Sequence, residues 1–82
     1  MTEEKISQAL TTVFHDVFDD RNIIIHRGLT AKGVEGWDSF NHVRLIVTIE
    51  ECFDISFSTT EIADLRNVGE LIDLVSLHLA KQ

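Results

Sequence analysis

Apolar residues recur every three or four positions along much of this chain, which is the spacing of amphipathic helices. A first helix is predicted over residues 3–18, with Thr2 as its cap and polar residues 19–22 at its end. Its apolar stripe contains Ile6, Leu10, Val13, Phe14, Val17 and Phe18. A second helix is predicted from Ser39 to about Phe53, capped by Asp38 or Ser39. Its apolar face contains Val43, Ile46, Ile49, Glu50 and Phe53, widened by Leu45 and Val47.

Capping patterns predict two more helices toward the C-terminus. Ser58 and Glu61 have the spacing of a capping box, which opens a short helix with Ile62 and Leu65 facing inward. Asn67 and Glu70 repeat this pattern before a last helix over residues 68–81. Its stripe contains Val68, Leu71, Ile72, Val75 and Leu79. The sequence therefore predicts an all-α fold over residues 1–82, a single small bundle of three longer helices and one short one.

A long connection over residues 19–37 separates the first two helices. It holds three consecutive isoleucines at 23–25 and glycines at 28, 33 and 36. A loop of this length is uncommon in a compact domain and is often functional. No partner strand is evident, so we expect the isoleucines, with Leu29 and Val34, to fasten the loop to the core.

The formal charge of −7 on 82 residues narrows the choice of partners. Binding to nucleic acid needs a basic surface, so this class of partner is excluded, and an acidic chain is expected to meet basic protein surfaces. Residues 38–64 alone carry six acids against Arg44, so this segment is either a solvated face or a docking surface. No apolar run is long enough for membrane insertion, and Cys52, expected to be partly covered, has no cysteine partner. We expect a cytoplasmic monomer.

Asp38, Ser39 and His42 hold the hydroxyl, imidazole and carboxylate of a hydrolytic triad within five residues. A triad places the histidine between the serine and the acid, whereas Asp38 is the direct neighbour of the serine at the helix start. We therefore expect no catalytic residue in this chain and an exposed His42. The histidines lack the spacing of a metal site, so no metal is expected either. What remains is an exposed serine at a helix N-terminus, a position that attracts phosphate.

The wider context of Ser39 resembles a known family. Residues 36–46 read GWDSFNHVRLI and residues 49–55 read IEECFDI. This pattern resembles the attachment region of acyl carrier proteins and, more broadly, of phosphopantetheine-binding domains, including peptidyl carriers. The resemblance implies that a separate phosphopantetheinyl transferase attaches 4′-phosphopantetheine from coenzyme A covalently to Ser39, with Asp38 completing the attachment motif. The chain would then be a discrete carrier of acyl or aminoacyl thioesters.

The same resemblance implies where partners and cargo meet the chain. Acyl- or aminoacyl-loading and transfer enzymes would dock mainly on the second helix, and the expected docking residues are Phe40, Val43, Arg44, Glu50, Glu51 and Ile62. Residues expected to line a space for the acyl chain are Val43, Ile46, Phe53, Ile62 and Leu65.

Three residues depart from the pattern of fatty-acid carriers. Phe40 replaces the usual leucine, Arg44 occupies a position that is commonly acidic, and Trp37 precedes the Asp-Ser pair. These differences favour a specialised pathway over general fatty-acid synthesis. The alternative function is a small acidic adaptor that binds proteins and carries no prosthetic group.

Overall fold

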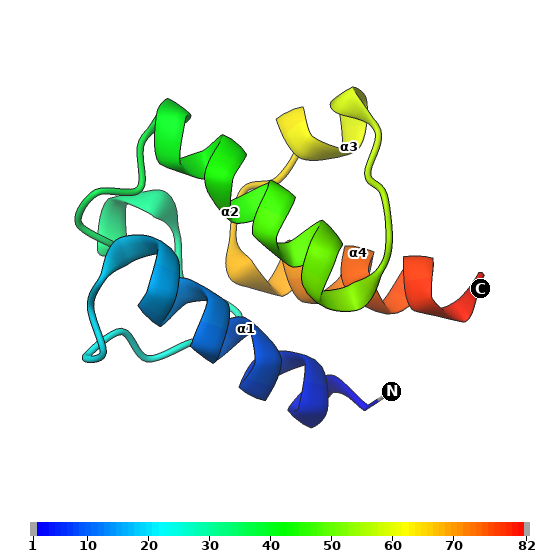
Figure 1. Ribbon diagram of the computed structural model, residues 1–82, viewed down its shortest axis with the longest axis horizontal. Coiled ribbons are helices and arrows are strands. Elements are labelled where there is room, and N and C mark those ends of the chain that lie inside the picture. The colour runs from blue at the N-terminus through cyan, green and yellow to red at the C-terminus, as the bar shows by residue number, and fades with distance from the viewer. Residues whose placement is uncertain (1, 82) are drawn as a thin grey trace.

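Four α-helices and one short 3₁₀ helix form the part of the chain that the computed structural model describes, residues 2–81 (Figure 1). The elements are α1 (Glu3–Phe18), the 3₁₀ helix η1 (Ala31–Gly33), α2 (Ser39–Phe53), α3 (Thr59–Ala63) and α4 (Val68–Ala80). No strand occurs within residues 2–81. The predicted all-α bundle of three longer helices and one short one is confirmed, although η1 was not expected.

Capping side chains mark the helix starts at the positions predicted from the sequence. The Thr2 hydroxyl accepts the Lys5 N–H (3.3 Å), and Ser58 and Glu61 form the complete capping box. At α2 the cap is Asp38, because its Oδ1 accepts the Asn41 N–H at 2.9 Å. The Glu70 side chain was expected to reach back to the cap residue of α4. It accepts instead the N–H of Arg66, one residue earlier, at 3.1 Å.

The core is formed where α1 packs against α2 and α4. The predicted α1 stripe is buried, with Phe14, Ile6 and Leu10 fully enclosed and Phe18 partly covered. On α2 the buried residues are Leu45, Ile46, Ile49 and Phe53. The placement of Val43 and Val47 on the inner side was wrong, since their exposed fractions are 60% and 46%. The helix is turned so that Leu45 points inward, which carries Val43 and Val47 to the outer side.

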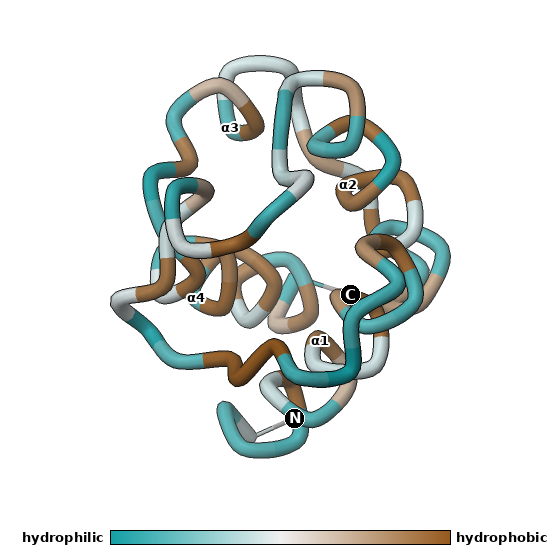
Figure 2. Tube along the Cα trace, turned by 90° about the vertical axis from the view of Figure 1, so that its left-hand side faces the viewer, coloured by the Kyte–Doolittle hydropathy of each residue, from teal (hydrophilic) through white to brown (hydrophobic). Residues whose placement is uncertain are grey.

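The connection over residues 19–37 follows the core surface, as expected. Leu29 and Val34 are buried, and Ile23 and Ile25 pack against the core, whereas the Ile24 side chain is 78% exposed. This isoleucine run is a strongly apolar stretch of an otherwise largely polar loop (Figure 2). His15 on α1 also holds the loop, because its Nε2 lies 2.9 Å from the Ile23 carbonyl oxygen.

Backbone hydrogen bonds fasten the same loop to the start of α4. The Val68 N–H donates to the Leu29 carbonyl and the Gly69 N–H to the Arg27 carbonyl, both at 2.8 Å. The Arg27 guanidinium adds ion pairs to Asp73 (2.7 Å) and to Glu3 (2.9 Å). The hydrogen bond to Asp73 and, to a smaller extent, the hydrogen bond to Glu3 raise the pKa of Arg27 above its ordinary value. The loop therefore joins the first turn of α1 to the first turns of α4 before it reaches α2.

Two further expectations concern the surface. No helix within residues 2–81 is long and apolar enough to cross a membrane. The Cys52 thiol was expected to be partly covered, and it is exposed instead.

Candidate functional site

Ser39 is the first residue of α2 and lies exposed at the end of the long loop. Gly36 turns the chain with a φ of +89°, a conformation that suits glycine. Hydrogen bonds from the Trp37 N–H to the Val34 carbonyl (3.2 Å) and from the Asp38 N–H to the Gly36 carbonyl (3.0 Å) fix the approach. Asp38 then caps the helix. The hydroxyl of Ser39 is thus displayed on a supported helix start and not on a mobile tail.

The first turn of α2 retains unused hydrogen-bond donors. The Asn41 N–H is taken by Asp38, and the His42 N–H donates to the Asp38 carbonyl at 2.8 Å. The N–H groups of Ser39 and Phe40 have no acceptor within residues 2–81. Free N–H groups and the positive end of the helix dipole favour an anion at this position. A phosphate ester on Ser39 suits this environment.

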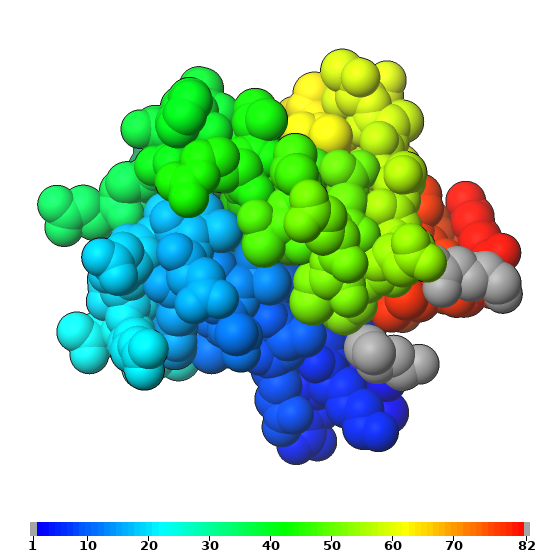
Figure 3. Space-filling view, in the orientation of Figure 1, coloured from blue at the N-terminus to red at the C-terminus, as the bar shows by residue number. Residues whose placement is uncertain are grey.

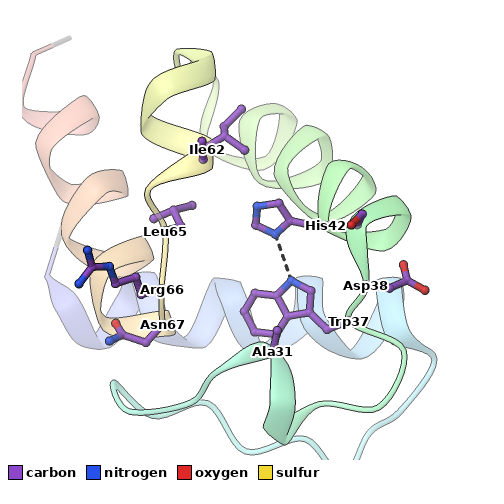
Figure 4. A pocket seen from close by; sticks show the side chains of 10 residues that line it. Ala31, Trp37, Asp38, His42, Ile62, Leu65, Arg66 and Asn67 are labelled. Atoms are coloured by element: carbon purple, nitrogen blue, oxygen red, sulfur yellow. Dashed lines mark hydrogen bonds between the residues drawn. The ribbon is translucent and has the colours of Figure 1, made fainter.

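An open groove of about 480 Å³ begins at Ser39 and runs between α2, α3 and η1. Figure 4 shows His42 and Trp37 on one side of it and Ile62 and Leu65 facing them. The Arg66 side chain points away from this space in the same view. The groove therefore offers an apolar wall opposite an imidazole–indole pair, directly beside the exposed hydroxyl.

His42 is not the exposed helix residue that the sequence suggested. Its ring is half-buried, and its Nδ1 lies 3.0 Å from the Trp37 Nε1 (Figure 4). An indole N–H can only donate, so Nδ1 is the acceptor and the neutral ring carries its proton on Nε2. A triad needs the opposite arrangement, with an Nδ1–H donated to an acid. Asp38 caps α2 instead, so the geometry gives Ser39 no general base.

Four of the six expected docking residues lie on the outer side of α2. Phe40 is 74% exposed, and Val43, Arg44 and Glu51 are exposed as well. With Val47 they form one stripe at i, i+3, i+4, i+7 and i+11, which we call the outer stripe: Phe40, Val43, Arg44, Val47 and Glu51. The surface of α2, green in Figure 3, is open on this face of the molecule.

The other two expected docking residues have different surroundings. The Glu50 carboxylate accepts the Phe57 N–H at 2.8 Å and so supports the turn after α2. Ile62 is half-buried in the groove beside Ser39. Glu50 therefore has a structural partner already, whereas Ile62 faces the space that a group on Ser39 would enter.

The five residues expected to line an acyl space lie in different surroundings. Ile62 and Leu65 line the groove at Ser39. Ile46 and Phe53 are buried in the core, and Val43 is on the outer stripe, so these three do not line it. His42 does so instead. Its spacing to Ile46, Ile49 and Phe53 is i, i+4, i+7 and i+11, a pattern that places it on the inner side of α2.

Comparisons with known proteins agree with this geometry. The family model for a phosphopantetheine attachment site matches residues 34–75, over half of the chain. The chain belongs to this family. A solved structure, the solution NMR structure of a holo acyl carrier protein from Geobacter metallireducens, is 43% identical to it. The match covers 92% of this chain and 86% of that one, with a TM-score of 0.87. No curated protein matches the chain.

Family membership decides between two classes of function. The chain is a carrier of the acyl-carrier type, which is modified by a separate transferase and is not itself catalytic. The prosthetic group of this family is covalently attached 4′-phosphopantetheine. The residues at the start of α2 fit such a group, because an exposed hydroxyl, two free N–H donors and an adjoining groove lie together. These findings disfavour an adaptor without a prosthetic group.

Proposed function

We propose that Ser39 is the attachment residue and that residues 1–82 act as a discrete carrier domain. The terminal thiol of the attached arm carries an acyl or aminoacyl group as a thioester. Loading and transfer enzymes then meet this group at a high effective concentration, because it is tethered to the protein that they bind. The chain contributes presentation and recognition, and its partners contribute the chemistry.

The observation that carries this proposal is the arrangement at the start of α2. Ser39 is exposed beside two unused N–H donors, and the imidazole one turn later has its Nδ1 engaged by Trp37. The hydroxyl is therefore a substrate for another enzyme and not a nucleophile activated within this chain. Its oxygen attacks the pantetheine-linked phosphorus of coenzyme A and forms the new phosphoester bond. The pyrophosphate bond of coenzyme A breaks, adenosine 3′,5′-bisphosphate leaves, and the proton of the serine passes to a base on the transferase. Asp38 holds the serine in place by capping the helix.

Intact-mass spectrometry tests the proposal. The purified chain is incubated with coenzyme A, Mg²⁺ and a broad-specificity phosphopantetheinyl transferase. We expect a gain of one phosphopantetheinyl group, lost in Ser39→Ala and kept in the matched control Ser56→Ala, another exposed serine. A folded wild-type chain that gains no mass would overturn the carrier assignment and restore the adaptor.

We further propose that the partners belong to a specialised pathway. Arg44 supports this, because its exposed guanidinium lies on the outer stripe and has no acidic partner within residues 2–81. Among the described residues, the guanidinium makes one hydrogen bond, at 3.3 Å to the Asn41 amide oxygen. A cation at this position repels the basic docking patches that acidic carriers meet. The exposed side chain of Phe40 adds a large apolar surface immediately after the proposed attachment serine.

The charge of Arg44 makes this part testable. Arg44→Glu is expected to raise the rate at which fatty-acid pathway enzymes use the holo form by about tenfold, roughly the effect of one docking charge. Arg21→Glu, an exposed loop change of equal charge, serves as the control. Identical kinetics for wild type and Arg44→Glu with these enzymes would contradict the proposed pathway preference.

A further inference from the structure

We propose that His42, oriented by Trp37, is a positioning residue that hydrogen-bonds the phosphopantetheine arm in the groove beside Ser39. This inference rests on the proposed attachment at Ser39. It assigns a role to two residues that the carrier function itself does not require, and it names the occupant of the groove.

Trp37 is a fixed support for this contact. Its indole packs edge-on against Phe14, with ring centroids 5.3 Å apart and an interplanar angle of 83°. It also lies 6.0 Å from the ring of Phe18, so α1 holds it on one side. On the other side the His42 ring lies nearly parallel to it, at 19° and 6.1 Å. The orientation of His42 is therefore set by a side chain that packs against the core.

The hydrogen bond from Trp37 also decides which nitrogen of His42 is available. With Nδ1 accepting the indole N–H, the neutral imidazole presents Nε2–H as a donor. This donor has no acceptor within residues 2–81, and its side chain lines the groove (Figure 4). A half-buried donor without a protein partner is satisfied by water or by a ligand. The arm brings acceptor oxygens to this place.

The position of Ser39 identifies the arm as the occupant. Ser39 and His42 are one helical turn apart and line the same groove. A group attached to the serine enters the groove at this end and meets His42 before it reaches Ile62 and Leu65. The phosphodiester and amide oxygens of the arm accept from Nε2–H, and its aliphatic part suits the apolar wall. Whether His42 meets the phosphodiester or an amide, the group that it contacts is an oxygen acceptor beside an aliphatic segment of the arm.

NMR of the holo protein tests the contact without any partner enzyme. Intact mass first establishes that each sample is modified. The attached arm carries ¹⁵N and ¹³C labels, and its resonances are recorded in the holo form of each variant. The imidazole ¹⁵N signals of His42 are compared between the apo and holo wild type. We expect the Nε2–H signal to shift on modification. A ³¹P shift would accompany contact with the phosphodiester, and an arm amide shift would accompany contact with the pantetheine part.

Two variants and a control make the result specific. His42→Phe removes the donor, and Trp37→Phe keeps an aromatic ring but removes the N–H that fixes the imidazole. Each is expected to lower the ratio of docked to free arm by up to about tenfold, the effect of one hydrogen bond. His26→Phe, an exposed histidine in the loop, leaves the ratio unchanged.

The outcomes separate this inference from the proposed function. Modified protein whose arm signals are the same in wild type, His42→Phe and Trp37→Phe would overturn the role of His42 and leave the carrier function standing. A folded wild-type chain that is never modified would remove both. Circular dichroism of the apo variants shows whether each one folds, and the His42 signals in the apo and holo wild type give a second readout that needs no variant.

Discussion

The starts of α2 and α4 are built alike and used differently. Each begins with a cap whose side chain accepts the third N–H of the turn, Asp38 for Asn41 (2.9 Å) and Asn67 for Glu70 (2.8 Å). At α4 the loop also supplies carbonyl oxygens to the two preceding N–H groups. At α2 the corresponding two donors, on Ser39 and Phe40, have no acceptor within residues 2–81.

This difference separates a structural helix start from a binding one. Val68 and Gly69 are buried under the loop, so their N–H groups need protein acceptors. Ser39 and Phe40 are exposed, so water satisfies their donors until an anion arrives. The same loop that closes α4 with its Arg27 and Leu29 carbonyls continues through Trp37 and delivers Ser39 to the surface. The first turn of α4 stabilises the fold, whereas the first turn of α2 keeps two N–H donors available for an anion.

The largest expected effect on stability comes from Gly69 in the closed start. A Cβ at this position would lie 3.0 Å from the Arg27 carbonyl oxygen and 3.1 Å from the Arg27 Cβ. Gly69→Ala is therefore expected to lower the free energy of unfolding by about 2 kcal/mol, as for other overpacked sites. Urea unfolding measures the loss. Gly28→Ala, whose Cβ meets nothing closer than 3.6 Å, is the control, and equal stability of the two variants would contradict the tight closure.

The two caps provide the next largest effect. Asn67→Ala and Asp38→Ala are each expected to lower the free energy of unfolding by about 1 kcal/mol, because each removes one side-chain cap. The two variants are expected to differ in the rate at which the prosthetic group is attached. The rate of phosphopantetheinyl transfer falls in Asp38→Ala and stays normal in Asn67→Ala, measured at a temperature where both are folded. Equal transfer rates would show that the two starts are not specialised as we describe.

The smallest effect concerns a third helix start, that of α3. The Ser58 N–H donates to the Glu61 carboxylate at 2.8 Å, and this bond is the main cause that lowers the pKa of Glu61. Contact with His78 lowers it further, and burial opposes the shift. A carboxylate with a lowered pKa in the folded state contributes stability above its unfolded pKa, about 4.3, and loses it as the pH falls through the folded value.

Acid titration of unfolding therefore checks the α3 cap. From about pH 4.3 downward the wild type is expected to lose slightly more stability than Glu61→Gln. Glu35→Gln, an exposed loop change, is expected to follow the wild type. Parallel curves for wild type and Glu61→Gln would contradict the assigned role of the carboxylate.

Local features of the fold were predictable from the sequence, and long-range ones were not. The caps Thr2, Ser58 and Asn67 act on residues three positions away, so their patterns are visible in the printed sequence. The carbonyls of Arg27 and Leu29 reach amides some forty residues later, and no local pattern marks them. The 3₁₀ helix at residues 31–33 has no periodicity of its own to reveal it.

The errors on α2 have a similar cause. Apolar residues surround much of this helix, so several faces match a helical stripe and only packing against α1 selects one. Choosing Val43 for the inner side hid the pattern that begins at His42. A histidine aligned with Ile46 and Ile49 was the available indication, but its partner Trp37 lies outside the helix and its role depends on the groove.

Mapping the modified residue tests the central claim most directly. The chain is produced together with a phosphopantetheinyl transferase, digested, and fragmented in a mass spectrometer that locates the added group. We predict that the group is found on the peptide containing Ser39 and on the oxygen of that serine alone. The account would be contradicted if the group were on another residue, such as Ser56 or Ser58, or if a folded chain carried none.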